Sequence, residues 1–153
     1  MKPSSPEKNR VWFWCSTIFR HFRLGLSRRL EPLGLTPPQY GVLMLLDHHR
    51  SLSVTEIARL AEADSPTICR ILDRLEKHGF VTRAQDVTDR RCLTMGLSVA
   101  GRALSDTCRS YSQEIEEAML VDFSAAERAL LLSMLQRLLH NVLNMNATDH
   151  RSE

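Results

Sequence analysis

Residues 53–97 decide the fold, and their sequence is SVTEIARLAEADSPTICRILDRLEKHGFVTRAQDVTDRRCLTMGL. The first four residues have the Ser-x-x-Glu spacing of a capping box, which predicts a short helix over 54–61. Ser65 and Pro66 form a second start signal, because serine favours the N-cap and proline tolerates the first helical position. Gly79 suits the residue that follows the end of this second helix. We therefore expect two short helices in close succession.

A β-hairpin is expected directly after the second helix. Residues 80–84 and 92–97 are typical of short strands, and the polar segment 85–91 between them is typical of a hairpin tip. Two closely linked helices followed by a hairpin make up a winged helix-turn-helix. The second helix, 65–78, is about 21 Å long at 1.5 Å per residue, which suits entry into the major groove of DNA. Residues 36–97 are therefore interpreted as a DNA-binding lobe.

The exposed face of this second helix carries the first group of candidate DNA contacts. With the apolar positions turned inward, the exposed candidates are Ser65, Thr67, Arg70, Arg74 and Lys77. The first two lie at the helix N-terminus, where free amides and the helix dipole favour phosphate. Arg70 is expected to contact a base edge, preferably of guanine, and Arg74 a base or a phosphate. The alternative is a solvated charged face with ion pairs within the helix.

The expected hairpin supplies a second group of candidate contacts. Its first strand ends near Arg83, and its tip contains Asp89, Arg90 and Arg91. A basic tip on a twisted ribbon can place an arginine in a narrow minor groove. Asp89 alone would repel phosphate, so we expect it to hold a neighbouring arginine in place. The alternative is an ordinary polar turn.

Helices are expected on both sides of the lobe. Residues 11–33 repeat apolar side chains at three- and four-residue steps, which indicates a long amphipathic helix. N-cap signals predict three further helices, which begin after Thr36, Ser98 and Ser124. The expected fold is therefore mainly α with a small two- or three-stranded β wing: a winged helix-turn-helix plus a helical dimerisation region at 11–33 and 99–144.

Composition and charge exclude several classes of protein. The 153 residues are 43% hydrophobic and 25% charged, and no apolar run approaches the ~20 residues of a membrane span, so a cytoplasmic location is expected. The net charge of +2 is unevenly distributed. Residues 1–50 hold eight Lys/Arg and three Asp/Glu, whereas residues 98–153 hold five and eight. Phosphate contact therefore suits the first part of the chain better than the last.

The sequence contains no pattern typical of an enzyme or a metal site. A glycine-rich phosphate loop, a nucleophile elbow and a metal-ligand cluster are all absent, so we expect no catalysis, cofactor or metal. The four cysteines are far apart in the sequence, and we expect reduced thiols at Cys15, Cys69, Cys92 and Cys108. Oxidation of Cys69 or Cys92, which would interfere with DNA binding, is the alternative.

Residues 36–101 resemble the MarR (multiple antibiotic resistance regulator) family of transcriptional regulators. The matching segments are TPPQYGVL at 36–43, VTEIA at 54–58, LDRLEKHGFV at 72–81, and DRR at 89–91 followed by LSVAG at 97–101. The family has threonine where Ser98 stands, which is a mild departure because both residues cap helices. The flanking helices match the family in order and length, so the resemblance extends over a single domain, 1–153.

The resemblance implies a homodimer formed by the N-terminal helix and the last two helices. It also implies binding to a pseudo-palindromic operator, with repression the commoner outcome and Arg91 in the minor groove. Family members often respond to a small aromatic or phenolic effector, for which the candidate lining residues are Trp12, Phe19, Tyr40 and Met44. The alternative role of these four side chains is ordinary packing.

Two other functions are compatible with parts of the sequence. The peroxide-sensing branch of the family has a cysteine in its first helix and a tyrosine just before its Pro-Gln-Tyr. In an alignment without gaps from 38–40, these two positions are occupied here by Trp12 and Pro37, so peroxide sensing is not expected. A helical interaction module without DNA binding is the other alternative. The presence of Arg70, Arg74 and Arg91 argues against it.

Overall fold

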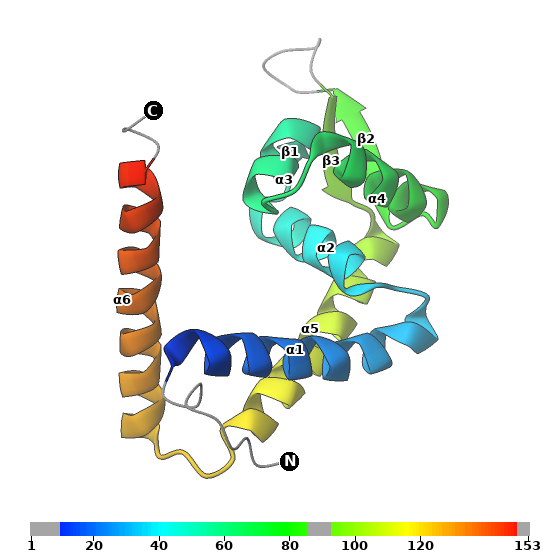
Figure 1. Cartoon of the computed structure of the whole chain (residues 1–153). Coiled ribbons are helices and arrows are strands. Elements are labelled where there is room, and N and C mark those ends of the chain that lie inside the picture. The colour runs from blue at the N-terminus through cyan, green and yellow to red at the C-terminus, as the bar shows by residue number, and fades with distance from the viewer. Residues whose placement is uncertain (1–9, 86–92, 150–153) are drawn as a thin grey trace. The chain divides into compact units, whose positions relative to one another are not determined.

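The computed structural model describes residues 10–85 and 93–149, with side chains up to Met145 (Figure 1). Its contacts divide the chain into two compact units, Met1–Ile115 and Glu116–Glu153. Its helices and strands are α1 (Val11–Leu30), the 3-10 helix η2 (Glu31–Leu33), α2 (Pro37–His49), β1 (Leu52–Ser53), α3 (Val54–Leu60), α4 (Ser65–Lys77), β2 (Val81–Gln85), β3 (Leu93–Leu97), α5 (Val99–Met119) and α6 (Ala125–Asp149). The predicted fold, mainly helical with a small β wing, is confirmed.

The capping boxes of α3 and α6 form as predicted. The Ser53 amide donates to Glu56 Oε2 at 2.7 Å, and the Glu56 amide donates to Ser53 Oγ at 3.3 Å. Ser124 and Glu127 make the same two bonds at 2.8 and 3.3 Å. These bonds satisfy amide groups that the first turn of a helix otherwise leaves unpaired. Helix α6 continues to Asp149, beyond the predicted end near residue 144.

The prediction that Ser65 caps α4 is wrong, because Asp64 is the N-cap. The backbone of Asp64 is extended (φ −73°, ψ 148°), and Ser65 is already the first helical residue. Asp64 Oδ1 accepts the Thr67 amide at 2.8 Å, and Oδ2 accepts the Thr67 hydroxyl at 2.8 Å. A carboxylate has two acceptor oxygens and a negative charge that the helix dipole favours, so it is the better cap of the two neighbours.

The end of α4 fixes where the wing begins. Gly79 has φ +73°, and its amide donates to Glu76 O, while the Phe80 amide donates to Leu75 O. This pair of bonds is a Schellman motif, which places glycine in the left-handed conformation just after a helix. Phe80 therefore belongs to the turn, and β2 begins at Val81 rather than at the predicted residue 80.

The wing is a three-stranded antiparallel sheet with the order β1-β3-β2. β2 pairs with β3 over its five residues, and the two-residue strand β1 pairs with β3 through Leu52 opposite Met95. In Figure 1 the sheet lies beside α3 and α4, the two helices of the helix-turn-helix. The apolar sides of α2, α3 and α4 fill the core of the lobe, with side chains at most 1% exposed at Leu43, Leu46, Ile57, Ile68, Leu72 and Leu75.

Within the described residues, no helix is long and apolar enough to cross a lipid bilayer.

Candidate DNA-binding surface

Helix α4 presents its cationic side chains away from the core. Ile68, Leu72 and Leu75 are buried, so Arg70, Arg74 and Lys77 lie on the exposed side, as the helical periodicity predicts. Among the described residues, no ion pair involves any of these three cations. The exposed side of α4 therefore carries positive charge that is available to a ligand.

Arg70 lies along the first turn of α4. Its Nε donates to Pro66 O at 3.2 Å, and its Nη2 donates to Thr67 Oγ1 at 3.4 Å. The Thr67 hydroxyl in turn donates to Asp64, so Thr67 is occupied by the cap and by Arg70. The backbone and hydroxyl hydrogen bonds from Thr67 hold the pKa of Asp64 below its ordinary value. The chain of contacts from Asp64 to Arg70 keeps this guanidinium near the N-terminus of α4.

Arg83, predicted as a DNA contact, is engaged with two carboxylates of α4. Its Nη2 lies 2.5 Å from Asp73 Oδ1, and its Nε lies 2.8 Å from Glu76 Oε2. Partial burial lowers the pKa of Arg83, but the two carboxylates raise it by more, so the net change is upward. The structure thus brings Arg83 from the wing to the helix that carries the other candidate contacts.

The predicted contacts at the wing tip, Asp89, Arg90 and Arg91, lie outside the described residues, as does Cys92. The other three cysteines are free. Cys15 and Cys69 are exposed, and Cys69 is on α4 beside Arg70. Cys108 is fully buried, and burial raises the pKa of its thiol, which disfavours the reactive thiolate. Within the described part of the chain, no group of three His, Cys, Asp or Glu side chains is placed to hold a metal ion.

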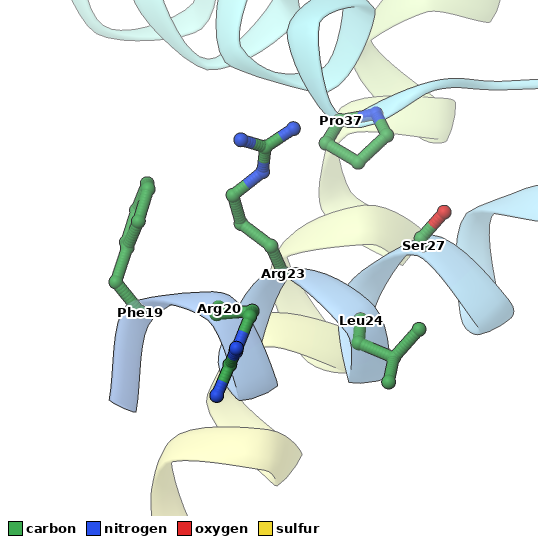
Figure 2. A pocket seen from close by; sticks show the side chains of 6 residues that line it. All are labelled: Phe19, Arg20, Arg23, Leu24, Ser27 and Pro37. Carbon is green, nitrogen blue, oxygen red and sulfur yellow. The ribbon is translucent and has the colours of Figure 1, made fainter. Parts of the chain in front are cut away.

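A surface depression of about 550 Å³ lies where α1 passes the start of α2. Figure 2 shows its lining residues: Phe19, Arg20, Arg23, Leu24, Ser27 and Pro37. The Arg23 side chain extends from α1 toward Pro37, and its guanidinium carbon lies 5.8 Å from the centre of the Phe19 ring. An exposed aromatic ring beside a cation makes this depression a candidate for binding an aromatic anion.

Of the four predicted effector residues, only Phe19 lines this depression. Trp12 lies on α1 with 57% of its surface exposed. Tyr40 is half-buried and donates its hydroxyl to Ser112 Oγ on α5 at 2.9 Å. Met44 is half-buried on α2. Arg20 and Arg23 were missed because the helical pattern shows only that they lie off the apolar stripe of α1, and not that α2 passes nearby.

The sequence of this chain is similar to those of known transcriptional regulators. The sequence profile of the MarR family matches residues 35–93. The HTH-type transcriptional regulator YfiV of Bacillus subtilis is 35% identical over 94 residues, which span 61% of this chain and 59% of YfiV. The HTH-type transcriptional repressor Rv2887 of Mycobacterium tuberculosis is 31% identical over 113 residues, 74% of this chain and 81% of the repressor.

Solved structures agree with the sequence comparison. A crystal structure of MarR is 27% identical and has a TM-score of 0.81, with 95% of this chain and 99% of that chain covered. A cysteine mutant of Escherichia coli MarR, complexed with operator DNA, shares the fold with a TM-score of 0.74 at 23% identity, covering 89% of this chain and 99% of that chain. The protein belongs to the MarR family of DNA-binding transcriptional regulators, which are not enzymes.

Proposed function

We propose that this regulator is a repressor that binds a pseudo-palindromic operator as a homodimer, with α4 of each protomer in the major groove. The observation that carries the proposal is the exposed side of α4. Among the described residues, Arg70, Arg74 and Lys77 form no ion pair, although Arg70 interacts electrostatically with the N-cap carboxylate of Asp64, whereas the two carboxylates within α4, on Asp73 and Glu76, are paired with Arg83. Such a surface favours phosphates and the acceptor atoms of guanine.

Dimerisation is supported by apolar side chains that each unit leaves in solvent. On α1, exposed residues include Val11, Trp12, Trp14, Ile18 and Phe19. On α6, those more than 40% exposed are Leu130, Leu132, Met134, Leu135, Leu139, Val142, Leu143 and Met145. Monomers rarely expose apolar area on this scale, and a second copy of the chain is the simplest partner that covers it. Two copies also supply the two recognition helices that an inverted repeat requires.

The repressor assignment draws on the relatives, one of which is named as a transcriptional repressor. A protein that represses transcription must reach the chromosome, so the proposed location is the bacterial cytoplasm. If the protein were instead an interaction module that does not bind DNA, the cations of α4 that form no ion pair would have no function.

Release of DNA by a small aromatic effector is a second part of the proposal, and the depression beside Pro37 supports it. Phe19 offers a ring face, and Arg20 and Arg23 offer positive charge, so an aromatic molecule with an acidic group fits best. We expect millimolar benzoate, but not the neutral analogue benzyl alcohol, to weaken DNA binding. Equal effects of the two compounds, or persistence of the benzoate effect in Phe19→Ala, would exclude this depression.

Thiol oxidation is a further candidate input, because Cys69 is exposed on α4 itself. Mild peroxide treatment should then weaken DNA binding of the wild type and leave Cys69→Ser unaffected. Identical binding before and after treatment would remove this input.

The proposed function is tested by equilibrium binding to DNA sequences selected from a random pool. Fluorescence anisotropy of a labelled duplex should show affinity that falls steeply with salt, because phosphate neutralisation releases counterions. Arg70→Ala should reduce the preference for one base pair by about 1–3 kcal/mol. Absent or salt-independent binding would contradict the proposed function.

A further inference from the structure

Arg83 connects the wing to the recognition helix. It stands in the middle of β2, opposite Met95 of β3, and its guanidinium bonds to Asp73 and Glu76, which lie three residues apart on α4. Residues at this spacing project from the same side of a helix, so one guanidinium can reach both carboxylates. Planar arginine donors suit such a paired contact better than the single ammonium of lysine does.

Arg83 gives β2 a side-chain contact with α4 beyond the base of the wing. At the base, the Phe80 amide bonds to Leu75 O, the Ser98 amide bonds to Phe80 O, and Val81 is buried. The rest of β2, from Thr82 to Gln85, is exposed. Within this described stretch, Arg83 is the only residue whose side chain is hydrogen-bonded to a helix. Arg83 therefore limits how far the outer part of β2 can move relative to α4.

Arg83 also changes the charge that α4 presents. The helix carries three cations and two carboxylates, so its formal charge is only +1. Unpaired carboxylates next to the DNA-contacting arginines would repel phosphate. Arg83 forms ion pairs with both of them, whereas Arg70, Arg74 and Lys77 form no ion pair among the described residues. Because its Nη2 and Nε are already committed, Arg83 is poorly placed to bind phosphate in the bidentate way that arginine favours.

We infer that Arg83 is a positioning residue for DNA binding: it holds the wing against the recognition helix and partly neutralises two carboxylates, and it does not itself contact DNA. This inference rests on the proposed DNA-binding function. Arg83 therefore differs from the other predicted contacts, because it affects DNA affinity through Asp73 and Glu76 and not by binding DNA itself.

A mutant cycle tests the inference. The variants are Arg83→Gln, the double variant Asp73→Asn with Glu76→Gln, and the triple variant, each as full-length protein on the same selected duplex. We expect Arg83→Gln to lower affinity roughly five- to tenfold, from two unpaired carboxylates and a looser wing. In the double-variant background the same change should cost less than about twofold, because the carboxylates that Arg83 pairs with are already neutral.

The salt dependence distinguishes positioning from direct contact. Loss of one phosphate contact reduces the slope of log K against log salt by about 0.9, and Lys77→Gln is the comparator expected to show this reduction. Arg83→Gln should reduce the slope by clearly less than Lys77→Gln does, because it removes no phosphate contact and the repulsion that it exposes is only screened by salt. A reduction equal to that of Lys77→Gln, or a loss of affinity that persists undiminished in the double-variant background, would show that Arg83 binds phosphate and would overturn the inference, as would wild-type affinity in Arg83→Gln.

A measurement without DNA separates the inference from the proposed function. Amide hydrogen exchange of residues 82–85 should be faster in Arg83→Gln than in the wild type, while exchange within α6 is unchanged. Unchanged exchange at 82–85 would show that Arg83 does not hold the wing against α4, even if DNA binding is confirmed. Failure of the wild type to bind any selected DNA would instead refute the proposed function, whatever the exchange data show.

Discussion

Replacing Gly101 with alanine should destabilise the junction between the wing and α5. A Cβ atom at this position would lie 1.9 Å from the carbonyl oxygen of Phe80 and 2.9 Å from its carbonyl carbon. An ordinary contact begins near 3.4 Å, so the oxygen or α5 has to move by about 1.5 Å. The atoms that the Cβ would meet belong to the backbone of Phe80 and not to the end of a flexible side chain, so no rotamer change can relieve the clash.

The expected loss in the free energy of unfolding depends on the hydrogen bonds that this movement disturbs. Phe80 O accepts the Ser98 amide at 3.0 Å, and Ser98 Oγ caps α5 by accepting the Gly101 amide at 2.9 Å. Overpacking costs about 1–3 kcal/mol and a weakened hydrogen bond about 0.5–1.5 kcal/mol, against a gain of up to ~1 kcal/mol in helix propensity. The expected net loss is about 2–3 kcal/mol, which lowers the melting temperature by roughly 4–12 °C in a protein of this size.

Gly41→Ala is the matched control for this change. Gly41 also lies within a helix, but a Cβ there meets no atom within 4 Å, so the substitution should stabilise the protein by up to ~1 kcal/mol. Urea and thermal denaturation of both variants measure the difference. If Gly101→Ala unfolds at or above the wild-type midpoint, the close approach of α5 to Phe80 is refuted.

Three further substitutions test separate parts of the structure. Leu72→Ala should cost about 2–5 kcal/mol of stability in urea denaturation, because the side chain is only 1% exposed; a loss under ~1 kcal/mol would contradict its place in the core. Tyr40→Phe removes the hydroxyl bond to Ser112 and should cost about 1 kcal/mol by the same assay, whereas an unchanged midpoint would mean that the bond adds nothing. Because Thr67 lowers the pKa of Asp64, the cap of α4 is intact above the ordinary value near 4 and is lost as pH falls through the lowered value. The protection of the Thr67 amide, measured relative to its intrinsic exchange rate, should therefore be high at pH 6 and be lost as the pH falls through the lowered pKa, and in Asp64→Ala it should be low throughout; pH-independent protection in the wild type would rule out the cap.

Local signals predicted the helices well. The boxes at Ser53 and Ser124 depend on residues three positions apart, and Gly79 ends α4 by its own conformation, so the sequence contains all the information needed. The N-cap of α4 was placed one residue late because two neighbouring residues, Asp64 and Ser65, are both good caps. The general preference for N-cap residues ranks the two types about equally, and the second acceptor oxygen and the negative charge of Asp64 decide between them.

Contacts between distant residues could not be predicted in this way. The periodicity of α4 shows that Arg70, Arg74 and Lys77 face away from the core, but it cannot show that Arg83 turns back onto that helix. Tyr40 was predicted as an effector contact because aromatic side chains suit aromatic ligands. Its hydroxyl partner is 72 residues away, so only the packing of α2 against α5 reveals the bond.

The proposed function requires two copies of α4 to bind an inverted repeat together. The most direct measurement combines the mass of the protein–DNA complex, from sedimentation equilibrium, with a footprint on DNA selected from a random pool. We predict two chains per duplex and two inverted half-sites whose centres lie about one helical turn, 10–10.5 base pairs, or a multiple of it, apart. One chain on a single half-site, or protection without a common sequence, would contradict the claim.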